Sequence, residues 1–317
     1  MKVQDETIDP LTYYTRHGLI TDPAEHVGWF DDRPRALPEL VQLVQGVMLH
    51  VFWAKSYGVT LTPDREAEAG YRRVARMLPR LRELDGRPLS VPRAPEHRLV
   101  GNCRSFSVLL ASLLRRQGVP ARARCGFGAY LRPGQYEDHW VGEYWNVEER
   151  RWALVDAQLD QLQCDALGVA FDPLDVPREQ FLVGGAAWAL CRGGSVDPER
   201  FGIFDMHGRW FVRGNLVRDV AALNKVELLP WDGWGLIDRR DQELTPDDLE
   251  LLDRAAALTA GETVPLAEVQ ALYVDERLRV PPVIRSYTSA GPLVVEVATE
   301  KVLPGLETNP VETVREP

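Results

Sequence analysis

The chain has 317 residues, of which 45% are hydrophobic and 26% charged, and its formal net charge is −10. This composition is that of an ordinary globular protein with a large core, in one elaborated domain or two. The negative charge, with no run of Lys or Arg, argues against nucleic acid as the main ligand. No apolar run approaches the roughly 20 residues that a bilayer requires, and the first residues show no leader, so we expect a cytoplasmic protein with no membrane partner.

The first third of the chain predicts helices. In residues 37–57 the apolar side chains recur at helical spacing, and Gly58 ends the pattern. Residues 62–84 open with Thr62, a Pro and acidic residues, which is typical of a capped helix start. A Pro-rich connector is expected at residues 87–95.

A further helix is predicted to begin at Cys103 and to end near residue 116. Its apolar residues recur at helical spacing, and Cys103 lies one turn before Phe106 on the same inward stripe. Asn102 is a suitable N-cap, so the thiol is expected over the first turn of the helix. Free backbone N–H groups and the helix dipole favour a thiolate there. Cys103 is therefore a candidate nucleophile, provided that a base lies near it.

Strands are expected next in the chain. Residues 121–131 predict one strand and residues 132–135 its turn, and residues 137–145 and 151–156 resemble an antiparallel hairpin rich in aromatic and β-branched residues. Together with the helices they predict an α+β fold, in which the nucleophile helix packs on an antiparallel sheet.

The hairpin is expected to bring a base and a carboxylate together. If its turn centres on Glu148-Glu149, Asn146 faces Arg151, and His139 and Asp156 lie diagonally on one face, about 7–8 Å apart between backbones. An imidazole and a carboxylate can meet across that gap. A shift of one residue in the register would send the two side chains to opposite faces.

The order of these motifs resembles the transglutaminase-like superfamily, which is related in fold to papain-type cysteine proteases. The resemblance covers residues 99–160 and rests on Gly-Asn-Cys at a helix start, Asp-His-Trp on a strand, and Trp152 four residues before Asp156. It implies that Cys103 is the nucleophile, His139 the general base and acid, and Asp156 the group that orients the imidazole. It also implies a papain-like core with helical elaborations on both sides.

The resemblance implies acyl transfer or amide hydrolysis through an acyl-Cys103 intermediate. The expected substrate is a small molecule or peptide with an amide or thioester, the acceptor is water or an amine, and no cofactor is expected. Two alternatives stay open: an arylamine N-acetyltransferase-like enzyme with an acyl-coenzyme A donor, and a non-catalytic transglutaminase-like binding module. A zinc site is not expected, because no Cys-x-x-Cys or His-x-x-x-His pair exists among the candidate ligands Cys103, Cys125, His139 and Cys164.

Further residues are candidates for the substrate and for the oxyanion. Arg104, with Arg192 or Arg213, is expected either to hold an anionic group of the substrate or to form structural salt bridges. Other candidates for substrate binding are Gln158, which follows Asp156 on the same face, and the cleft aromatics Trp231 and Trp234. Asp160 is the alternative orienting carboxylate. The Cys103 N–H is one oxyanion donor, and the second is open among Trp53, Tyr57 and His97.

The second half of the chain gives weaker signals. Helices are expected at residues 177–190, 216–224, 246–258 and 266–278. We therefore expect a helical N-terminal elaboration over residues 1–95, a transglutaminase-like core over 96–175, a mixed helical and loop part over 176–290, and an acidic, partly mobile tail over 291–317.

Overall fold

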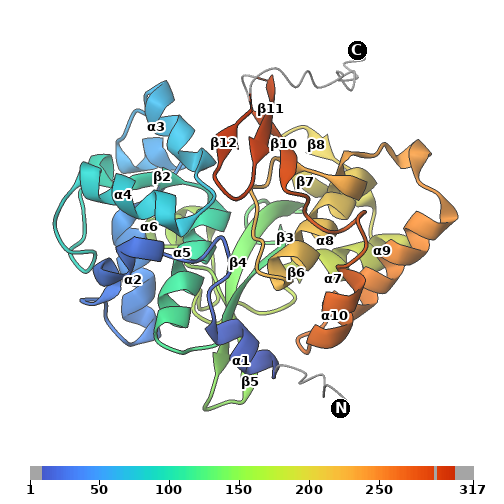
Figure 1. Cartoon of the computed structure of the whole chain (residues 1–317), viewed down its shortest axis with the longest axis horizontal. Coiled ribbons are helices and arrows are strands. Elements are labelled where there is room, and N and C mark those ends of the chain that lie inside the picture. The colour runs from blue at the N-terminus through green and yellow to red at the C-terminus, as the bar shows by residue number, and fades with distance from the viewer. Residues whose placement is uncertain (1–8, 289–290, 304–317) are drawn as a thin grey trace, which may run out of the picture.

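A six-stranded sheet lies between two groups of helices in the computed structural model of the chain, which describes residues 9–288 and 291–303 (Figure 1). The strand order is β6-β3-β4-β7-β8, and β5 pairs with β4 as well. All pairs are antiparallel except β4 with β7. The strands are β3 (Ala121–Gly128), β4 (Tyr136–Asn146), β5 (Arg151–Val155), β6 (Phe181–Val183), β7 (Phe201–Ile203) and β8 (Met206–His207). The predicted α+β class is confirmed.

One group of helices comes from residues 10–167 and contains the helix that begins at Cys103. These helices are α1 (Pro10–Thr15), α2 (Leu37–Val47), α3 (Pro63–Ala67), α4 (Val74–Leu84), α5 (Cys103–Arg116) and α6 (Gln161–Leu167). Helix α5 packs on β3 and β4, and it is buried along almost its whole length. The predicted start of this helix and its N-cap are confirmed.

The helix predicted over residues 37–57 is only half correct, because α2 ends at Val47. The next residues form β1 (Met48–His50), which pairs in parallel with β2 (Leu99–Gly101) in a separate two-stranded sheet. A short apolar run fits a buried strand as well as a helix, so periodicity alone did not separate the two. This strand ends opposite the residues that lead into Cys103.

The helix predicted over residues 62–84 is also interrupted, between α3 and α4. The backbone N–H groups of Arg72 and Arg73 donate to the carboxylate of Glu300 at 2.8 and 3.0 Å. They are therefore not available to a continuous helix. Short 3₁₀ helices fill this and other connections: η1 (Ala24–Phe30), η2 (Ala54–Tyr57), η3 (Glu68–Gly70), η4 (Pro95–His97), η5 (Pro198–Arg200), η6 (Gly235–Asp238) and η7 (Asp241–Glu243).

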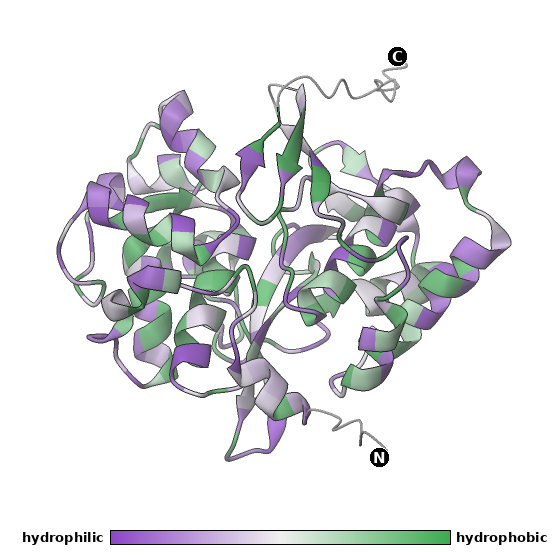
Figure 2. Ribbon diagram, viewed as in Figure 1, coloured by the Kyte–Doolittle hydropathy of each residue, from purple (hydrophilic) through white to green (hydrophobic). Residues whose placement is uncertain are grey.

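The other group of helices comes from the second half of the chain: α7 (Gly184–Arg192), α8 (Arg209–Leu223), α9 (Pro246–Thr259) and α10 (Leu266–Leu272). Helix α9 agrees with its prediction and is capped by Thr245. Figure 2 shows apolar and polar residues on different sides of this helix, as its packing against α7 and α8 requires. The helix predicted at residues 177–190 is wrong in its first half, since residues 181–183 are paired with β3 as β6.

A third sheet, of four strands, closes the described part of the chain. It consists of β9 (Asp232–Gly233), β10 (Val283–Thr288), β11 (Gly291–Glu296) and β12 (Lys301–Val302). Residues 291–303, which we predicted as the start of a tail, therefore belong to a sheet. The rest of the predicted tail, residues 304–317, lies outside the described residues.

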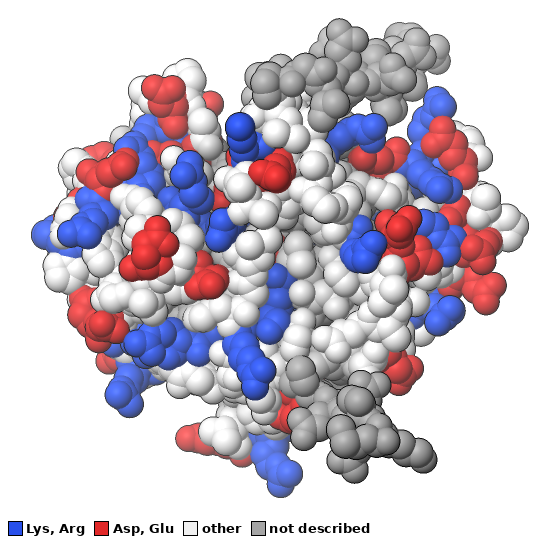
Figure 3. All heavy atoms as spheres, viewed as in Figure 1, with Lys and Arg blue, Asp and Glu red and all other residues white. Residues whose placement is uncertain are grey.

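Charged side chains are buried between the central sheet and α8. The guanidinium of Arg124 donates to Asp219 at 2.9 Å and to Glu143 at 3.1 Å, and all three side chains are inaccessible to solvent. Arg122 and Arg178 also bind Glu143. On the face drawn in Figure 3, positive and negative side chains are interleaved. Within the described residues, no helix has the length and apolarity needed to cross a membrane.

Candidate active site

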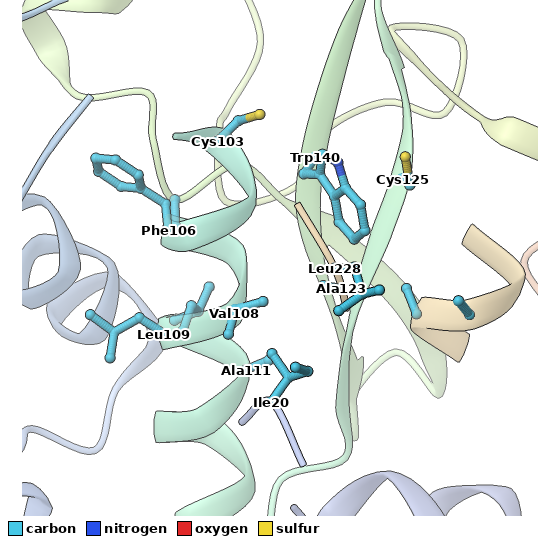
Figure 4. Close-up of a cluster of buried hydrophobic side chains, with 14 of the residues drawn as sticks. Ile20, Cys103, Phe106, Val108, Leu109, Ala111, Ala123, Cys125, Trp140 and Leu228 are labelled. Carbon is cyan, nitrogen blue, oxygen red and sulfur yellow. The ribbon is translucent and has the colours of Figure 1, made fainter. Parts of the chain in front are cut away.

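Cys103 is held at the first position of α5 by a reciprocal cap. The Asn102 side chain accepts from the Ser105 N–H at 3.1 Å, and the Ser105 hydroxyl accepts from the Asn102 N–H at 3.4 Å. Figure 4 shows the Cys103 sulfur on the side of α5 that faces the strands, near Trp140 of β4. The residue is only 7% exposed, so most of it is packed. The positive end of a 14-residue helix is directed at this thiol.

His139 and Asp156 are brought together by the hairpin of β4 and β5. The predicted register is confirmed, because Asn146 pairs with Arg151 and Gly142 with Val155. Asp156 is the first residue after β5, and its Oδ2 lies 2.7 Å from Nε2 of His139. Both side chains are buried. The expected meeting of the imidazole and the carboxylate on one face is therefore seen in the structure.

The thiol of Cys103 interacts with the same imidazole. Burial acts to lower the pKa of His139, but the charge of Asp156, its hydrogen bond and the hydrogen bond with Cys103 outweigh burial, so the pKa lies well above its ordinary value. Nε2 is engaged with Asp156, so Nδ1 is the ring nitrogen that remains for another partner. The charged form of His139 is therefore favoured by the carboxylate and by the nearby thiol.

Tyr130 is a member of the site that the sequence did not suggest. It lies in the turn after β3, its hydroxyl donates to Oδ2 of Asp156 at 2.6 Å, and its ring meets the His139 ring edge-on at 5.8 Å between centroids. Burial and the neighbouring carboxylate raise the pKa of Tyr130 well above its ordinary value, so the hydroxyl remains a donor. A lone Tyr in a turn carries no local signal of this role.

Asp156 thus accepts three hydrogen bonds, the third from the backbone N–H of Gln158 to its Oδ1 at 3.0 Å. Burial acts to raise the pKa of Asp156, but the charge of His139 and the hydrogen bonds lower it below its ordinary value. The side chain of Gln158 does not bond His139. Its amide nitrogen donates to Gln163, and its buried oxygen has no hydrogen-bond partner in the described part of the chain.

Asp160, the alternative orienting carboxylate, is committed elsewhere. Its Oδ2 accepts from the Tyr57 hydroxyl at 2.7 Å, and its Oδ1 caps α6 through the Gln163 N–H at 3.1 Å. Tyr57 is thereby also occupied as a donor. Of the other two residues suggested as oxyanion donors, His97 is exposed in η4 and Trp53 is partly exposed at the start of η2.

The arginines suggested for substrate binding are structural, and this part of the prediction is corrected. Arg104 is fully buried and donates to three backbone carbonyls, those of Tyr71, Arg72 and Glu227. Burial lowers its pKa to about 10.

The other two arginines are paired with carboxylates. Arg192 binds Asp253 at 2.8 Å, and Arg213 binds Asp241. Their guanidinium groups are therefore already used by the fold.

The two tryptophans suggested for a cleft differ in their surroundings. Trp234 is 2% exposed, and its indole N–H donates to the Leu278 carbonyl at 2.9 Å, so it fills the core and does not line a cleft. Trp231 is partly buried beside β10, where its carbonyl accepts from the Tyr287 N–H. Its part in substrate binding stays a prediction.

All four cysteines are free thiols. Among the described residues, no group of three or more His, Cys, Asp or Glu side chains is placed to hold a metal ion.

Comparison with known proteins supports the resemblance seen in the motifs. Residues 64–157 match the family model of the transglutaminase-like superfamily, and this range contains Cys103, His139 and Asp156. Neither the curated proteins nor the solved structures gave a match to the chain. Members of the superfamily are generally cysteine enzymes. The match covers less than a third of the chain, and over that range, residues 64–157, the chain is similar to the transglutaminase-like superfamily.

Proposed function

We propose that the protein is a cysteine-dependent acyl transferase or amide hydrolase whose nucleophile is Cys103. The observation that supports this most strongly is the 2.7 Å contact of His139 Nε2 with Asp156 Oδ2, together with the effect of the nearby Cys103 thiol, which helps to raise the pKa of His139. In a cysteine enzyme the thiolate is the attacking group, and an imidazole accepts the proton of the thiol and later donates it to the leaving group. We also propose a papain-like core, because the nucleophile helix α5 packs on the antiparallel strands β3 and β4.

The proposed reaction has two stages. The cycle starts from the thiolate of Cys103 and the protonated imidazole of His139; the thiolate attacks the carbonyl carbon of an amide or thioester, and the tetrahedral intermediate collapses to an acyl-Cys103 thioester. The bond to the leaving group breaks, and the proton of the His139 imidazolium passes to that group. His139 then accepts a proton from water or an amine, which attacks the thioester and releases the thiolate.

Asp156 and Tyr130 have supporting roles in this scheme. The carboxylate fixes the orientation of the His139 ring and stabilises its charged form, as the aspartate of a catalytic triad does. The Tyr130 hydroxyl holds Oδ2 of that carboxylate in place. These groups are compatible with water or an amine as the acyl acceptor and with amides or thioesters as substrates.

A labelling experiment tests the proposal before a substrate is known. Iodoacetamide at pH 7 is expected to label Cys103 faster than Cys164 and Cys191, although those two thiols are more accessible. Burial raises the pKa of Cys191 to about 11 and also raises that of Cys164, so both are largely protonated and slow. Mass spectrometry of the peptides gives the three rates side by side.

A library of amides and thioesters then serves to trap an acyl adduct on Cys103, with Cys103→Ala as the control. An adduct on the Cys103 peptide identifies the acyl donor, and release by water or by an added amine identifies the acceptor. Slow labelling of Cys103, together with the absence of any adduct, would favour the non-catalytic binding module over the enzyme.

A further inference from the structure

The proposed acyl chemistry needs two hydrogen-bond donors for the oxygen of the tetrahedral intermediate. The backbone of the nucleophile helix provides the first of these donors. The backbone N–H of Cys103 lies at the free end of α5, where it has no partner within the helix. The second donor has to reach the same place. The candidate is His50, at the end of β1.

The β1 strand places His50 beside the approach to the nucleophile. His50 pairs with Gly101, two residues before Cys103, in the parallel ladder of β1 and β2. A side chain at Gly101 would meet Met48 at 2.6 Å and Ser105 at 2.9 Å, so this side of β1 faces the first turn of α5. His50 alternates onto the same side as Met48.

The surroundings of the His50 ring agree with this position. The centroid of the ring lies 6.4 Å from that of Phe106, one turn into α5. His50, Phe106 and Gln158 line one small cavity. The ring is also close enough to His139 and Asp156 to feel their charges.

A backbone hydrogen bond determines which ring nitrogen of His50 carries the proton. Nδ1 accepts the Phe52 N–H at 3.3 Å, so a neutral ring carries its proton on Nε2. Burial, and then the neighbouring charge of His139, lower the pKa of His50 to about 3, which keeps the ring neutral at physiological pH. Among the hydrogen bonds of the described residues none involves Nε2 of His50, which leaves this donor for a ligand.

We propose that the Nε2–H of His50 and the backbone N–H of Cys103 together bind the oxyanion of the tetrahedral intermediate. As the sulfur–carbon bond forms, the π electrons of the carbonyl move to its oxygen, which accepts both hydrogen bonds. When the carbonyl re-forms and the leaving group departs, the two bonds weaken again. His50 keeps its proton throughout, and the proton for the leaving group comes from His139.

The test compares two reagents that differ in whether an oxyanion forms. p-Nitrophenyl acetate acylates a thiolate through a tetrahedral intermediate, whereas iodoacetamide alkylates it by direct displacement at carbon. Rates for Cys103 are measured with both reagents in the wild type, His50→Leu and His50→Gln, by p-nitrophenolate release and by mass spectrometry of the Cys103 peptide. His26→Leu, at a partly exposed histidine, is the matched control.

In His50→Leu, acylation by p-nitrophenyl acetate is expected to fall by about 10²-fold, the loss seen when one oxyanion donor is removed. Alkylation by iodoacetamide is expected to stay within about 2-fold, because that reaction needs no oxyanion donor. His50→Gln retains an N–H donor and is expected to recover part of the acylation rate. His26→Leu is expected to match the wild type with both reagents.

Two results would overturn the inference while leaving the proposed function in place. One is a His50→Leu variant that is acylated as fast as the wild type. The other is an equal loss with both reagents, which would mean that His50 only supports the position of Cys103. If wild-type Cys103 reacts with neither reagent, the proposed function fails, and the role of His50 fails with it.

Discussion

Asp156 and Asp160 form a matched pair for testing the site, because only one of the two carboxylates contacts an imidazole. Each accepts a Tyr hydroxyl and a backbone N–H, and Asp156 accepts His139 in addition. In Asp156→Asn, the amide has one oxygen for three donors. If that oxygen faces His139 and Tyr130, the NH₂ group opposes the Gln158 N–H.

The cost follows from these contacts. One charge-assisted hydrogen bond is lost and two become neutral, which lowers the free energy of unfolding by about 2–4 kcal/mol at pH 7. Since the charge of Asp156 is the main cause that raises the pKa of His139, this pKa falls in the variant. Acylation of Cys103 is expected to drop by about 10³–10⁴-fold, as when the aspartate of a triad is replaced by Asn.

Asp160→Asn is the control. Asn is as good an N-cap as Asp, so α6 is expected to remain, and the acylation rate is expected to stay within about 3-fold of the wild type. The rates are measured by p-nitrophenolate release and the stabilities by urea unfolding. The assignment of Asp156 would be refuted if Asp160→Asn lost as much activity, or if Asp156→Asn retained all of it.

Three further predictions concern the nucleophile, the pH dependence of stability and the packing of the sheet. Cys103→Ala is expected to abolish acylation with little change in melting temperature, and adding His139→Ala is expected to cause no further loss, whereas additive losses would contradict a concerted site. Because folding raises the pKa of His139, wild-type stability falls as the pH rises above about 6.5, by up to about 1.4 kcal/mol per pH unit relative to His139→Gln. Parallel urea-unfolding profiles for the two proteins would argue against the ion pair of His139 and Asp156. In Gly126→Ala the new methyl group would lie 2.1 Å from the Leu182 carbonyl oxygen, so the free energy of unfolding in urea is expected to fall by about 3 kcal/mol or more. Gly142→Ala is the control and is expected to lose less, because the nearest neighbour of its methyl group is a side chain at 3.1 Å. Equal losses in the two variants would contradict this explanation.

The parts of the site that could be predicted from the sequence depend on local rules. Helix α5 has an N-cap and a helical apolar stripe, and the hairpin has a short polar turn that sets its register. These features placed Cys103 at a helix start and His139 beside Asp156. A register fixed by one turn determines which side chains share a face over the whole hairpin.

The parts that were missed depend on contacts between distant residues. The apolar run that contains β1 resembles a helix until its partner β2, about 50 residues later, is known. The bond of Tyr130 to Asp156 joins a turn to a strand end, and no sequence period reports it. Arg104 follows the nucleophile, and its sequence position allows either a substrate ligand or a structural salt bridge; instead it donates to three backbone carbonyls from other segments.

The buried arginines also set a lower limit on the length of a fragment of this protein that can fold. Arg124, within the family-matched range, depends on Asp219 of α8, and Arg104 depends on the Glu227 carbonyl, both outside that range. Removing one partner of a buried ion pair costs about 3–5 kcal/mol, and a whole domain is stable by only about 5–15 kcal/mol. A fragment of residues 64–157 is therefore expected not to fold, and the region that sequence comparison recognises is smaller than the unit that folds.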